Sequence, residues 1–181
     1  MNELRNILES VNDWLKFAEA KNAVVVAASG FGLWASLRLA LSSEIQCYAA
    51  TYFTSLSFFF LGGFVTVLLS FLPVLNYRWV ISRPARLANS NILYFGYLAT
   101  LSKKQFLEAY LKATESKEVD VKEIHGMFAE QIIINSRIAL AKYAMFEFAI
   151  KLILLGVLTP LVAIPVLYFS KKKRESIDDI R

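Results

Sequence analysis

An uncharged stretch from Ile45 to Tyr77 constrains the fold of this chain more than any other feature. Its centre reads YFTSLSFFFLGGFVTVLLSFLPVL, without any Asp, Glu, Lys or Arg. A helix of about 20 mostly apolar residues is long enough to cross the hydrocarbon core of a bilayer. A chain of 181 residues that carries further apolar blocks has too little polar sequence to cover such a run in water. We therefore expect a membrane span here.

Two further apolar blocks have nearly the length of a span. Residues 22–37 lack charge, and the block reaches full length only if Arg38 lies near a membrane face and snorkels outward. Residues 152–170 also lack charge but contain Pro160 and Pro165. We favour a single crossing with a kink near Pro160 for this third block, with a re-entrant segment as the alternative. A re-entrant segment would leave the basic tail on the same side of the membrane as the segment that precedes the third block.

Composition supports this interpretation, because hydrophobic residues make up 56% of the chain and charged residues only 19%, against about a quarter charged in a typical soluble domain. The sequence predicts an all-α membrane protein with about three transmembrane helices and a helical cytoplasmic segment between spans two and three. Its expected parts are an amphipathic cytoplasmic helix (1–21), a transmembrane hairpin (22–77, spans at about 22–41 and 48–75), a helical sensor segment (78–147), a third span (148–170) and a basic tail (171–181).

The first 21 residues predict a helix with one apolar face, because apolar residues recur there at helical spacing. These residues are Leu4, Ile7, Leu8, Val11, Trp14, Leu15 and Ala18. The face either packs on the soluble part, which we favour, or lies on the membrane surface with Trp14 at the headgroups. Acidic residues in this segment argue against a cleavable signal peptide.

Half of the 20 Lys and Arg residues lie between residues 78 and 147. Under the positive-inside rule, the N-terminus and this middle segment face the cytoplasm. Ser102 with Gln105 and Asp120 with Glu123 each form the pattern of a capping box. One helix is expected to start at Ser102, and a longer one to run from about residue 121 into the third span.

The residues needed for common catalytic and metal sites are missing from the sequence. Cys47 and His125 are the only cysteine and histidine, so neither a disulfide framework nor a Cys/His metal site is expected. No G-x-S-x-G or Walker-type loop occurs. We therefore expect no enzyme, no catalytic residues and no metal. Basic and aromatic residues do not interleave as in nucleic-acid-binding proteins, so no DNA or RNA partner is expected.

Polar residues beside the first two spans form two clusters, each with two interpretations. Glu19, Lys21 and Asn22 are either a solvated helix end with a snorkelling lysine or part of a ligand pocket. Arg83 and Arg86 either anchor the membrane face or bind a phosphate, which a guanidinium can hold through two hydrogen bonds.

Two further clusters lie in the middle segment. Asn91, Tyr94 and Phe95 belong to the sequence NILYFG, whose aromatic pair either packs in a core or stacks on a base. The fourth cluster lies on the predicted long helix, where an interfacial anchor is the alternative to a ligand contact. Its residues are Gln131, Ser136, Arg137, Lys142 and Tyr143.

These clusters, in this order and with these spans between them, resemble the membrane-spanning effector family of the Pycsar bacterial anti-phage systems. The resemblance extends over about residues 14–165. An acidic-x-Lys element at the first span is matched by Glu19-Ala20-Lys21, and an N/G-x-L-F/Y-F-G-like element by residues 91–96. A Gln-Ile…Ser-x-Ile…Lys-Tyr helix is matched by Gln131, Ile132, Ser136, Ile138, Lys142 and Tyr143.

The resemblance implies an effector of the bacterial inner membrane, multi-pass with a cytoplasmic N-terminus. A partner cyclase would make a cyclic pyrimidine mononucleotide such as cCMP or cUMP, and the effector would sense it, impair membrane integrity and arrest growth. We expect no cofactor besides this ligand, contact with the lipid bilayer, and a homo-oligomer. A β-barrel nucleotide-binding domain is not apparent, so the helical cytoplasmic part or a partner would have to sense the nucleotide.

Two other classes of function remain open from the residues alone. One is a constitutive channel or transporter subunit, for which the spans offer few polar groups. The other is a membrane scaffold whose cytoplasmic helices dock a soluble partner. An effector for cyclic oligonucleotides is a further alternative within the defence class.

Overall fold

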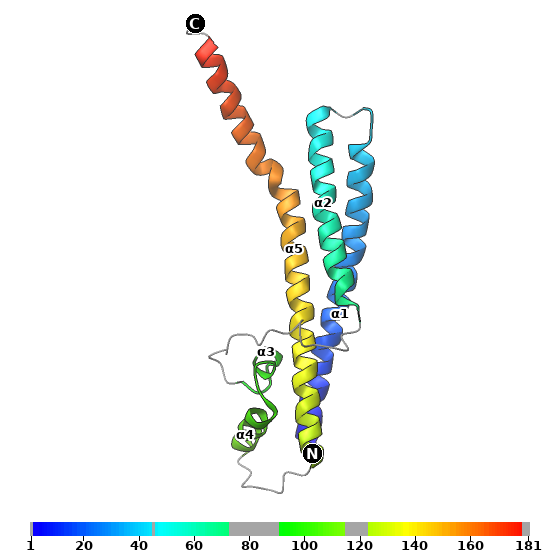
Figure 1. Cartoon of the computed structure of the whole chain (residues 1–181), viewed down its shortest axis with the longest axis vertical. Coiled ribbons are helices and arrows are strands. Elements are labelled where there is room, and N and C mark those ends of the chain that lie inside the picture. Colours follow the sequence, from blue (N-terminus) through cyan, green and yellow to red (C-terminus); the bar gives the residue numbers. More distant parts are fainter. Residues whose placement is uncertain (1, 45, 73–90, 115–122, 179–181) are drawn as a thin grey trace. The chain divides into compact units, whose positions relative to one another are not determined.

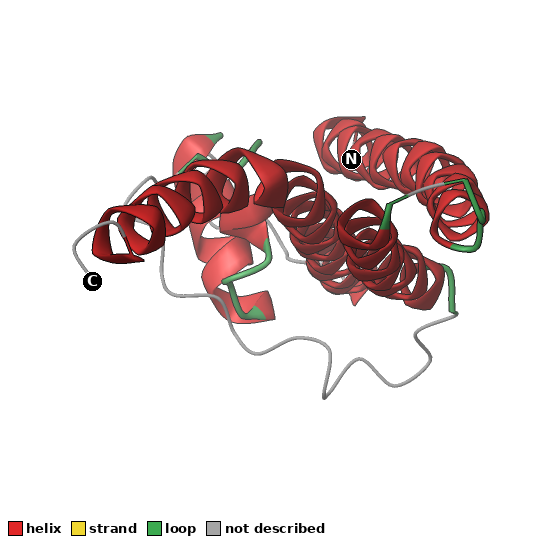
Figure 2. Cartoon of the chain, turned by 90° about the horizontal axis from the view of Figure 1, so that it is seen from above, coloured by secondary structure: helices red, strands yellow, loops and turns green. Residues whose placement is uncertain are grey.

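The computed structural model describes residues 2–44, 46–72, 91–114 and 123–178, with side chains up to residue 160. These residues form five helices (Figure 1): α1 (Asn2–Ala40), α2 (Cys47–Ser70), α3 (Phe95–Leu98), α4 (Lys103–Ala113) and α5 (Glu123–Asp178). Figure 2 shows only helices and loops in these ranges, without a strand. The expected all-α class is therefore confirmed for the described part of the chain.

Two of the expected spans coincide with helices long and apolar enough to cross a membrane, α1 and α2. The first 21 residues and the first span form one continuous helix, α1. The helix within the second span, α2, ends at Ser70, and the expected end of that span at about residue 75 lies outside the described residues. The third apolar block lies inside α5, which stays helical across Pro160 and Pro165. Its crossing of the membrane remains a prediction.

The chain divides into two compact units. Unit 1 consists of Met1–Val24 and Leu68–Glu147, and unit 2 consists of Val25–Val67 and Phe148–Arg181. The helices α1, α2 and α5 each supply residues to both units. The short helices α3 and α4 belong to unit 1 alone.

Unit 1 has a hydrophobic core built from α1, α3, α4 and α5. As the helical spacing predicts, Leu4, Ile7 and Val11 on α1 are buried, and α4 contributes the fully buried Phe106. The predicted capping box holds the start of α4. The Ser102 side chain accepts from the Gln105 amide, and the Gln105 side chain accepts from the Ser102 amide. The second predicted box includes Asp120, which lies outside the described residues.

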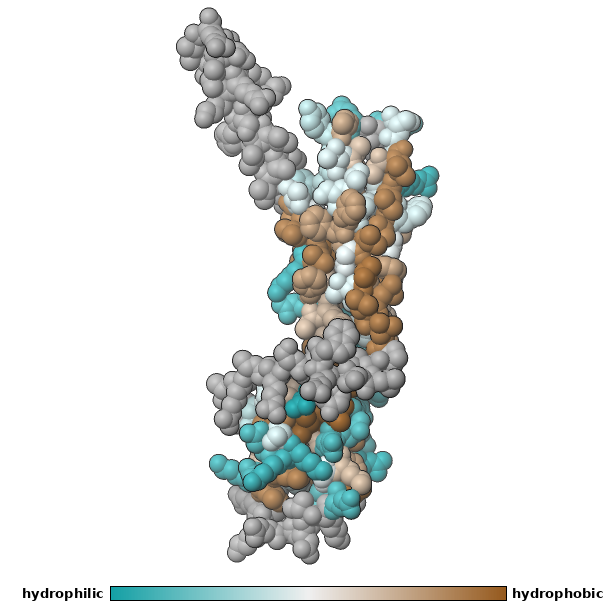
Figure 3. All heavy atoms as spheres, viewed as in Figure 1, coloured by the Kyte–Doolittle hydropathy of each residue, from teal (hydrophilic) through white to brown (hydrophobic). Residues whose placement is uncertain are grey.

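Unit 2 consists of apolar helix segments that pack closely at glycines. Gly32 lies against the Phe60 ring, Gly156 against Phe59, and Gly63 against Ile153. Without a side chain, glycine permits the close approach of helices that is common in membrane proteins. On the face in Figure 3, hydrophobic side chains gather over the parts of α1 and α2 that belong to this unit. That surface suits contact with lipid.

Candidate functional site

Four residues from three helices meet in a polar cluster of unit 1, which we call the lysine junction: Glu19 and Asn22 on α1, Ser70 at the end of α2, and Lys142 on α5. The Lys142 ammonium donates to the Ser70 carbonyl oxygen at 2.8 Å and pairs with the Glu19 carboxylate at 3.1 Å. The Asn22 side-chain amide donates to the Ser70 hydroxyl at 3.0 Å and to the Lys142 carbonyl at 3.4 Å. Each of the three helices is thereby tied to the other two.

Burial places three of the four residues of the lysine junction inside unit 1, whereas the Glu19 side chain is 47% exposed. Asn22 is fully buried, Ser70 is 3% exposed, and the Lys142 side chain is 11% exposed. A buried ammonium is tolerated only when it is paired and hydrogen-bonded. Its bond to the last carbonyl of α2 also places a positive charge at a helix C-terminus, where it is favourable. Lys142 therefore stabilises the end of α2, which the sequence alone did not indicate.

Three buried polar atoms near these helices make no hydrogen bond to the residues that the structure describes. They are Asn22 Oδ1, Ser136 Oγ and Tyr143 OH. Such atoms carry a cost unless a partner reaches them. All three belong to residues that the sequence predicts to contact a ligand. Within the described part of the structure, each of these atoms could still form a hydrogen bond with a ligand.

Aromatic rings form a second cluster in unit 1. Phe95 on α3 stacks on Tyr143 with ring centroids 5.4 Å apart, and it also contacts Trp14 at 5.5 Å and Tyr94 at 5.1 Å. Phe95 is 7% exposed, whereas Tyr94 is 44% exposed. Core packing therefore accounts for Phe95, and Tyr94 is the ring of the pair with a surface open to a ligand.

Lys21 lies among three rings of unit 1. Its ammonium is 4.6 Å from the ring centroid of Phe17, 5.4 Å from that of Phe146 and 5.5 Å from that of Tyr143. The ion pairs found among the described residues do not include Lys21, and its neighbour Glu19 is already paired with Lys142. Within the described part of the chain, Lys21 therefore presents a positive charge that is held by cation–π contacts and not by an ion pair.

The remaining predicted residues lie apart from the lysine junction. Gln131 donates to Asn135 at 2.9 Å, and Asn135 donates in turn to Asn12 on α1 at 2.7 Å. Asn91 accepts from the Leu93 amide at 2.9 Å in the turn before α3. Arg83 and Arg86 lie outside the described residues, so their predicted phosphate contact stays a prediction.

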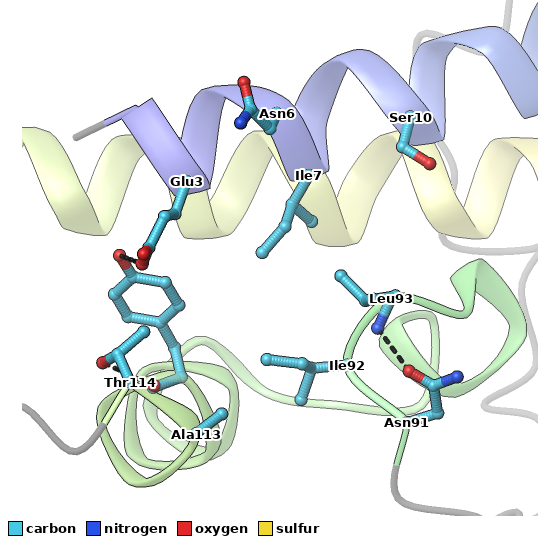
Figure 4. Close-up of a pocket in the computed structure, with 10 residues that line it drawn as sticks. Glu3, Asn6, Ile7, Ser10, Asn91, Ile92, Leu93, Ala113 and Thr114 are labelled. Carbon is cyan, nitrogen blue, oxygen red and sulfur yellow. Dashed lines mark hydrogen bonds between the residues drawn. The ribbon is translucent and has the colours of Figure 1, made fainter.

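Asn91 also lines a pocket of about 530 Å³ in unit 1, between the start of α1, the turn at residues 91–93 and the end of α4 (Figure 4). Ile7 and Ile92 point into it from opposite sides, and the Tyr110 hydroxyl donates to Glu3 at 3.1 Å. Burial, followed by the hydrogen bond to Glu3 and its negative charge, raises the pKa of Tyr110. Among the described residues that line the pocket, only Glu3 is charged. This pocket therefore disfavours an anion.

Sequence reasoning missed one residue that positions the site. Ser70 looks like an ordinary hydroxyl in an apolar span, yet it anchors the lysine junction. Arg137 belongs to the fourth polar cluster that the sequence indicates. It donates to the carbonyl oxygens of Ala99 and Leu101 at 2.9 and 3.1 Å, which holds the segment after α3 against α5. No group of His, Cys, Asp and Glu suited to a metal ion occurs within the described ranges.

Comparison with known proteins gives a family. The family model PycTM, described as the Pycsar effector protein domain, matches residues 3–169. The search of curated proteins found no match, and neither did the search of solved structures. The match spans nearly the whole chain and includes the three segments on which the sequence resemblance rests. The chain is therefore a membrane protein that belongs to the Pycsar effector family of anti-phage proteins.

Proposed function

We propose that the protein is a ligand-gated effector of the bacterial inner membrane, with a cytoplasmic N-terminus and no catalytic activity of its own. A cyclic pyrimidine mononucleotide such as cCMP or cUMP, made by a partner cyclase during infection, binds to unit 1. Several copies then assemble and impair the integrity of the membrane, and the cell stops growing. Family membership supports the defence role, and the two apolar helices support the membrane location.

The lysine junction is the observation that carries the ligand-gated part of this proposal. It joins α1, α2 and α5. The same three helices continue into unit 2 and contain all of its described helical residues. A ligand that binds one packing of these helices better than another shifts the equilibrium by its difference in affinity. A change at the lysine junction would then change the helices that contact lipid.

Unit 1 offers contacts for both parts of a nucleotide. Tyr94 presents an exposed ring for the base, and Arg83 and Arg86 are the cations proposed for the phosphate. Lys142 would reach a phosphate only by leaving Glu19 and Ser70. The proposed nucleotide contacts are Glu19, Asn22, Arg83, Arg86, Asn91, Tyr94, Phe95, Gln131, Ser136, Lys142 and Tyr143.

We also propose a third crossing by residues 148–170 of α5, which would place the basic tail outside. The continuity of α5 through both prolines supports a single pass over a re-entrant segment. A Ser176→Cys variant in a Cys47→Ser background places a single cysteine in the tail. Adding a membrane-impermeant thiol label to intact cells tests the crossing directly, and we expect labelling of this variant. Labelling only after the cells are lysed would contradict the third crossing.

Dye release from vesicles tests the ligand-gated function. Full-length protein is reconstituted into vesicles that enclose a self-quenching dye, and cCMP, cUMP, cAMP or linear CMP is added. We expect release with a cyclic pyrimidine nucleotide and none with linear CMP. Steady release without any nucleotide would favour the constitutive channel instead, and no release with any nucleotide would reject gating by these ligands.

A variant pair connects the release to the proposed site. Tyr94→Ala removes the exposed ring and is expected to raise the nucleotide concentration needed for release by about tenfold, since stacking on one base contributes about 1–3 kcal/mol. Tyr48→Ala removes a tyrosine that is 84% exposed in unit 2 and serves as the matched control. Equal responses of the two variants would remove Tyr94 from the site.

A further inference from the structure

Two aromatic side chains at the edge of the buried face of α1 remain largely uncovered in unit 1. Leu4, Ile7 and Val11 pack inward as expected. Trp14 contacts Phe95 of the core but is still 42% exposed, and Phe17 is 51% exposed. Lys21 follows Phe17 by four residues, so the three side chains lie along one face of the helix. An exposed Trp-Phe-Lys face on a soluble surface would be costly and would need a partner.

The position of this face along α1 identifies the partner. The uncharged run of residues 22–37 begins directly after Lys21, within the same continuous helix. Trp and Lys side chains at the end of an apolar span lie at the level of the lipid headgroups. Lys21 therefore reaches the headgroup region whichever way the rest of unit 1 is turned.

The charge of this face identifies the kind of headgroup. The rings of Phe17, Tyr143 and Phe146 surround the Lys21 ammonium, and no carboxylate pairs with it among the described residues. Rings replace part of the water shell of the ammonium but do not neutralise it. A phosphate anion completes such a site, because it supplies the missing charge and accepts hydrogen bonds from the ammonium.

We propose that Lys21, within the rings of Phe17, Tyr143 and Phe146, binds the phosphate of an anionic membrane lipid. The same chemistry would fit the phosphate of a nucleotide. A lipid is the better source because the exposed Phe17 ring lies 4.6 Å from the ammonium and the exposed Trp14 ring contacts Phe17, and such rings suit the acyl–headgroup boundary. The effector would then depend on the anionic lipid content of the membrane, independently of its activating ligand.

Quenching of Trp14 fluorescence by brominated lipid tests the proposal. Full-length protein carrying Trp34→Phe and Trp79→Phe, which leaves Trp14 as the only tryptophan, is reconstituted into phosphatidylcholine vesicles with a minor fraction of phosphatidylglycerol. One of the two lipids is brominated in each sample. We expect stronger quenching by brominated phosphatidylglycerol than by an equal amount of brominated phosphatidylcholine. Equal quenching by both, or no quenching by either, would overturn the proposal.

Substitutions at Lys21 show whether the ammonium causes the preference. A basic residue near an anionic surface contributes about 1 kcal/mol, which corresponds to about a fivefold preference. Lys21→Gln is expected to remove that preference, and Lys21→Arg to retain it, which also shows that the position tolerates change. Lys16→Gln is the matched control, since Lys16 lies on the same helix, is 75% exposed and pairs with Asp13. A preference that survives Lys21→Gln would contradict the assignment.

Addition of cCMP separates the two sources of phosphate. We expect the lipid preference to persist when cCMP is present, because the lipid and not the nucleotide occupies the Lys21 site. Loss of the preference on adding cCMP would assign the site to the nucleotide and overturn the lipid proposal. Failure of both cCMP and cUMP to release dye, with the lipid preference intact, would reject the gating proposal and leave this one standing.

Discussion

The two units of the molecule hold their helices together by different means. In unit 1, polar side chains bond from one helix to another, as in the contacts of Lys142 with Glu19 and Ser70 and of Asn135 with Asn12. In unit 2, most hydroxyls bond to a carbonyl of their own helix, as Thr54 and Thr66 do. The helices of unit 2 instead meet at glycines that lie against large side chains.

The proposed topology accounts for this difference, because it places unit 1 in water and unit 2 in the bilayer. Apolar burial drives the packing of helices in water, and polar contacts then select one arrangement. In a bilayer the lipid is as apolar as the side chains, so close fit of small against large residues becomes the main source of association. Polar contacts thus join the helices of unit 1, and shape complementarity joins those of unit 2.

The largest expected effect is the difference in stability lost when a buried or an exposed phenylalanine is removed. Phe106→Ala in the core of unit 1 should lower the free energy of unfolding by about 3–5 kcal/mol, because it leaves a cavity around a fully buried site. Phe31→Ala in unit 2, at a residue 69% exposed, should change it by less than about 0.5 kcal/mol in detergent. Thermal unfolding followed by circular dichroism compares the two, and similar losses would contradict the assigned burial.

Lys142→Met tests whether the lysine junction stabilises unit 1. The substitution leaves the Ser70 carbonyl without its donor and Glu19 without its partner, and should cost about 1–3 kcal/mol. Lys104→Met is the control, since Lys104 is 88% exposed and its pair with Glu108 spans 4.0 Å. If Lys142→Met were neutral or stabilising in the same thermal assay, the desolvation of the ammonium would outweigh its contacts, and the lysine junction would not be a source of stability.

Substitutions at two glycines test whether the helices of unit 2 are closely packed. A Cβ added at Gly156 would lie 2.7 Å from Phe59 Cβ, an atom that no side-chain rotation can move away. Gly156→Ala should therefore cost about 1–3 kcal/mol. At Gly62 the nearest atom is the end of the Leu152 side chain at 3.4 Å, so Gly62→Ala should be tolerated. Unfolding in mixed micelles of increasing SDS content measures both, and equal stability would mean that unit 2 is not closely packed at Gly156.

A smaller effect is expected from the hydroxyl pair of unit 2, in which Ser36 and Ser57 lie 2.8 Å apart on different helices. Ser36→Ala should cost about 0.6 kcal/mol, the average for hydrogen bonds between membrane helices. Thr54→Val, which removes a bond within one helix, should cost less. A loss at Ser36 as large as that at Lys142 would erase the contrast between the units.

The smallest effect concerns the pH dependence of unit 1. Because the pKa of Tyr110 is raised in the folded protein, the unfolded chain loses its phenol proton first as the pH rises. The contribution of Tyr110 to stability is therefore fully present below about pH 10 and declines above it. Tyr110→Phe should show a shallower decline of unfolding free energy in that range, whereas Tyr48→Phe should not. An unchanged slope in Tyr110→Phe would mean that neither burial nor the contact with Glu3 raises the pKa of Tyr110 in solution.

Local patterns predicted much of the fold. The helical spacing of Leu4, Ile7 and Val11 gave the buried face of α1, and the Ser102–Gln105 pair gave the start of α4. Both depend on residues a few positions apart, so the sequence is enough to read them. Contacts between residues that are distant in the chain were harder to predict. Ser70 and Lys142 are 72 positions apart, and no spacing rule indicates that one caps the other.

The sequence by itself determined the apolar spans, the all-helical class and the family, because each depends on composition, periodicity or ordered motifs. Only the tertiary structure decided which groups surround each of the described candidate residues. Lys142 and Lys21 both read as basic residues next to a span. Packing buried Lys142 in contact with a carboxylate and a helix end, and left Lys21 among rings without a counter-charge in the described part of the chain. The free energy of a charged group depends on the groups that surround it, and those come together only when the chain folds.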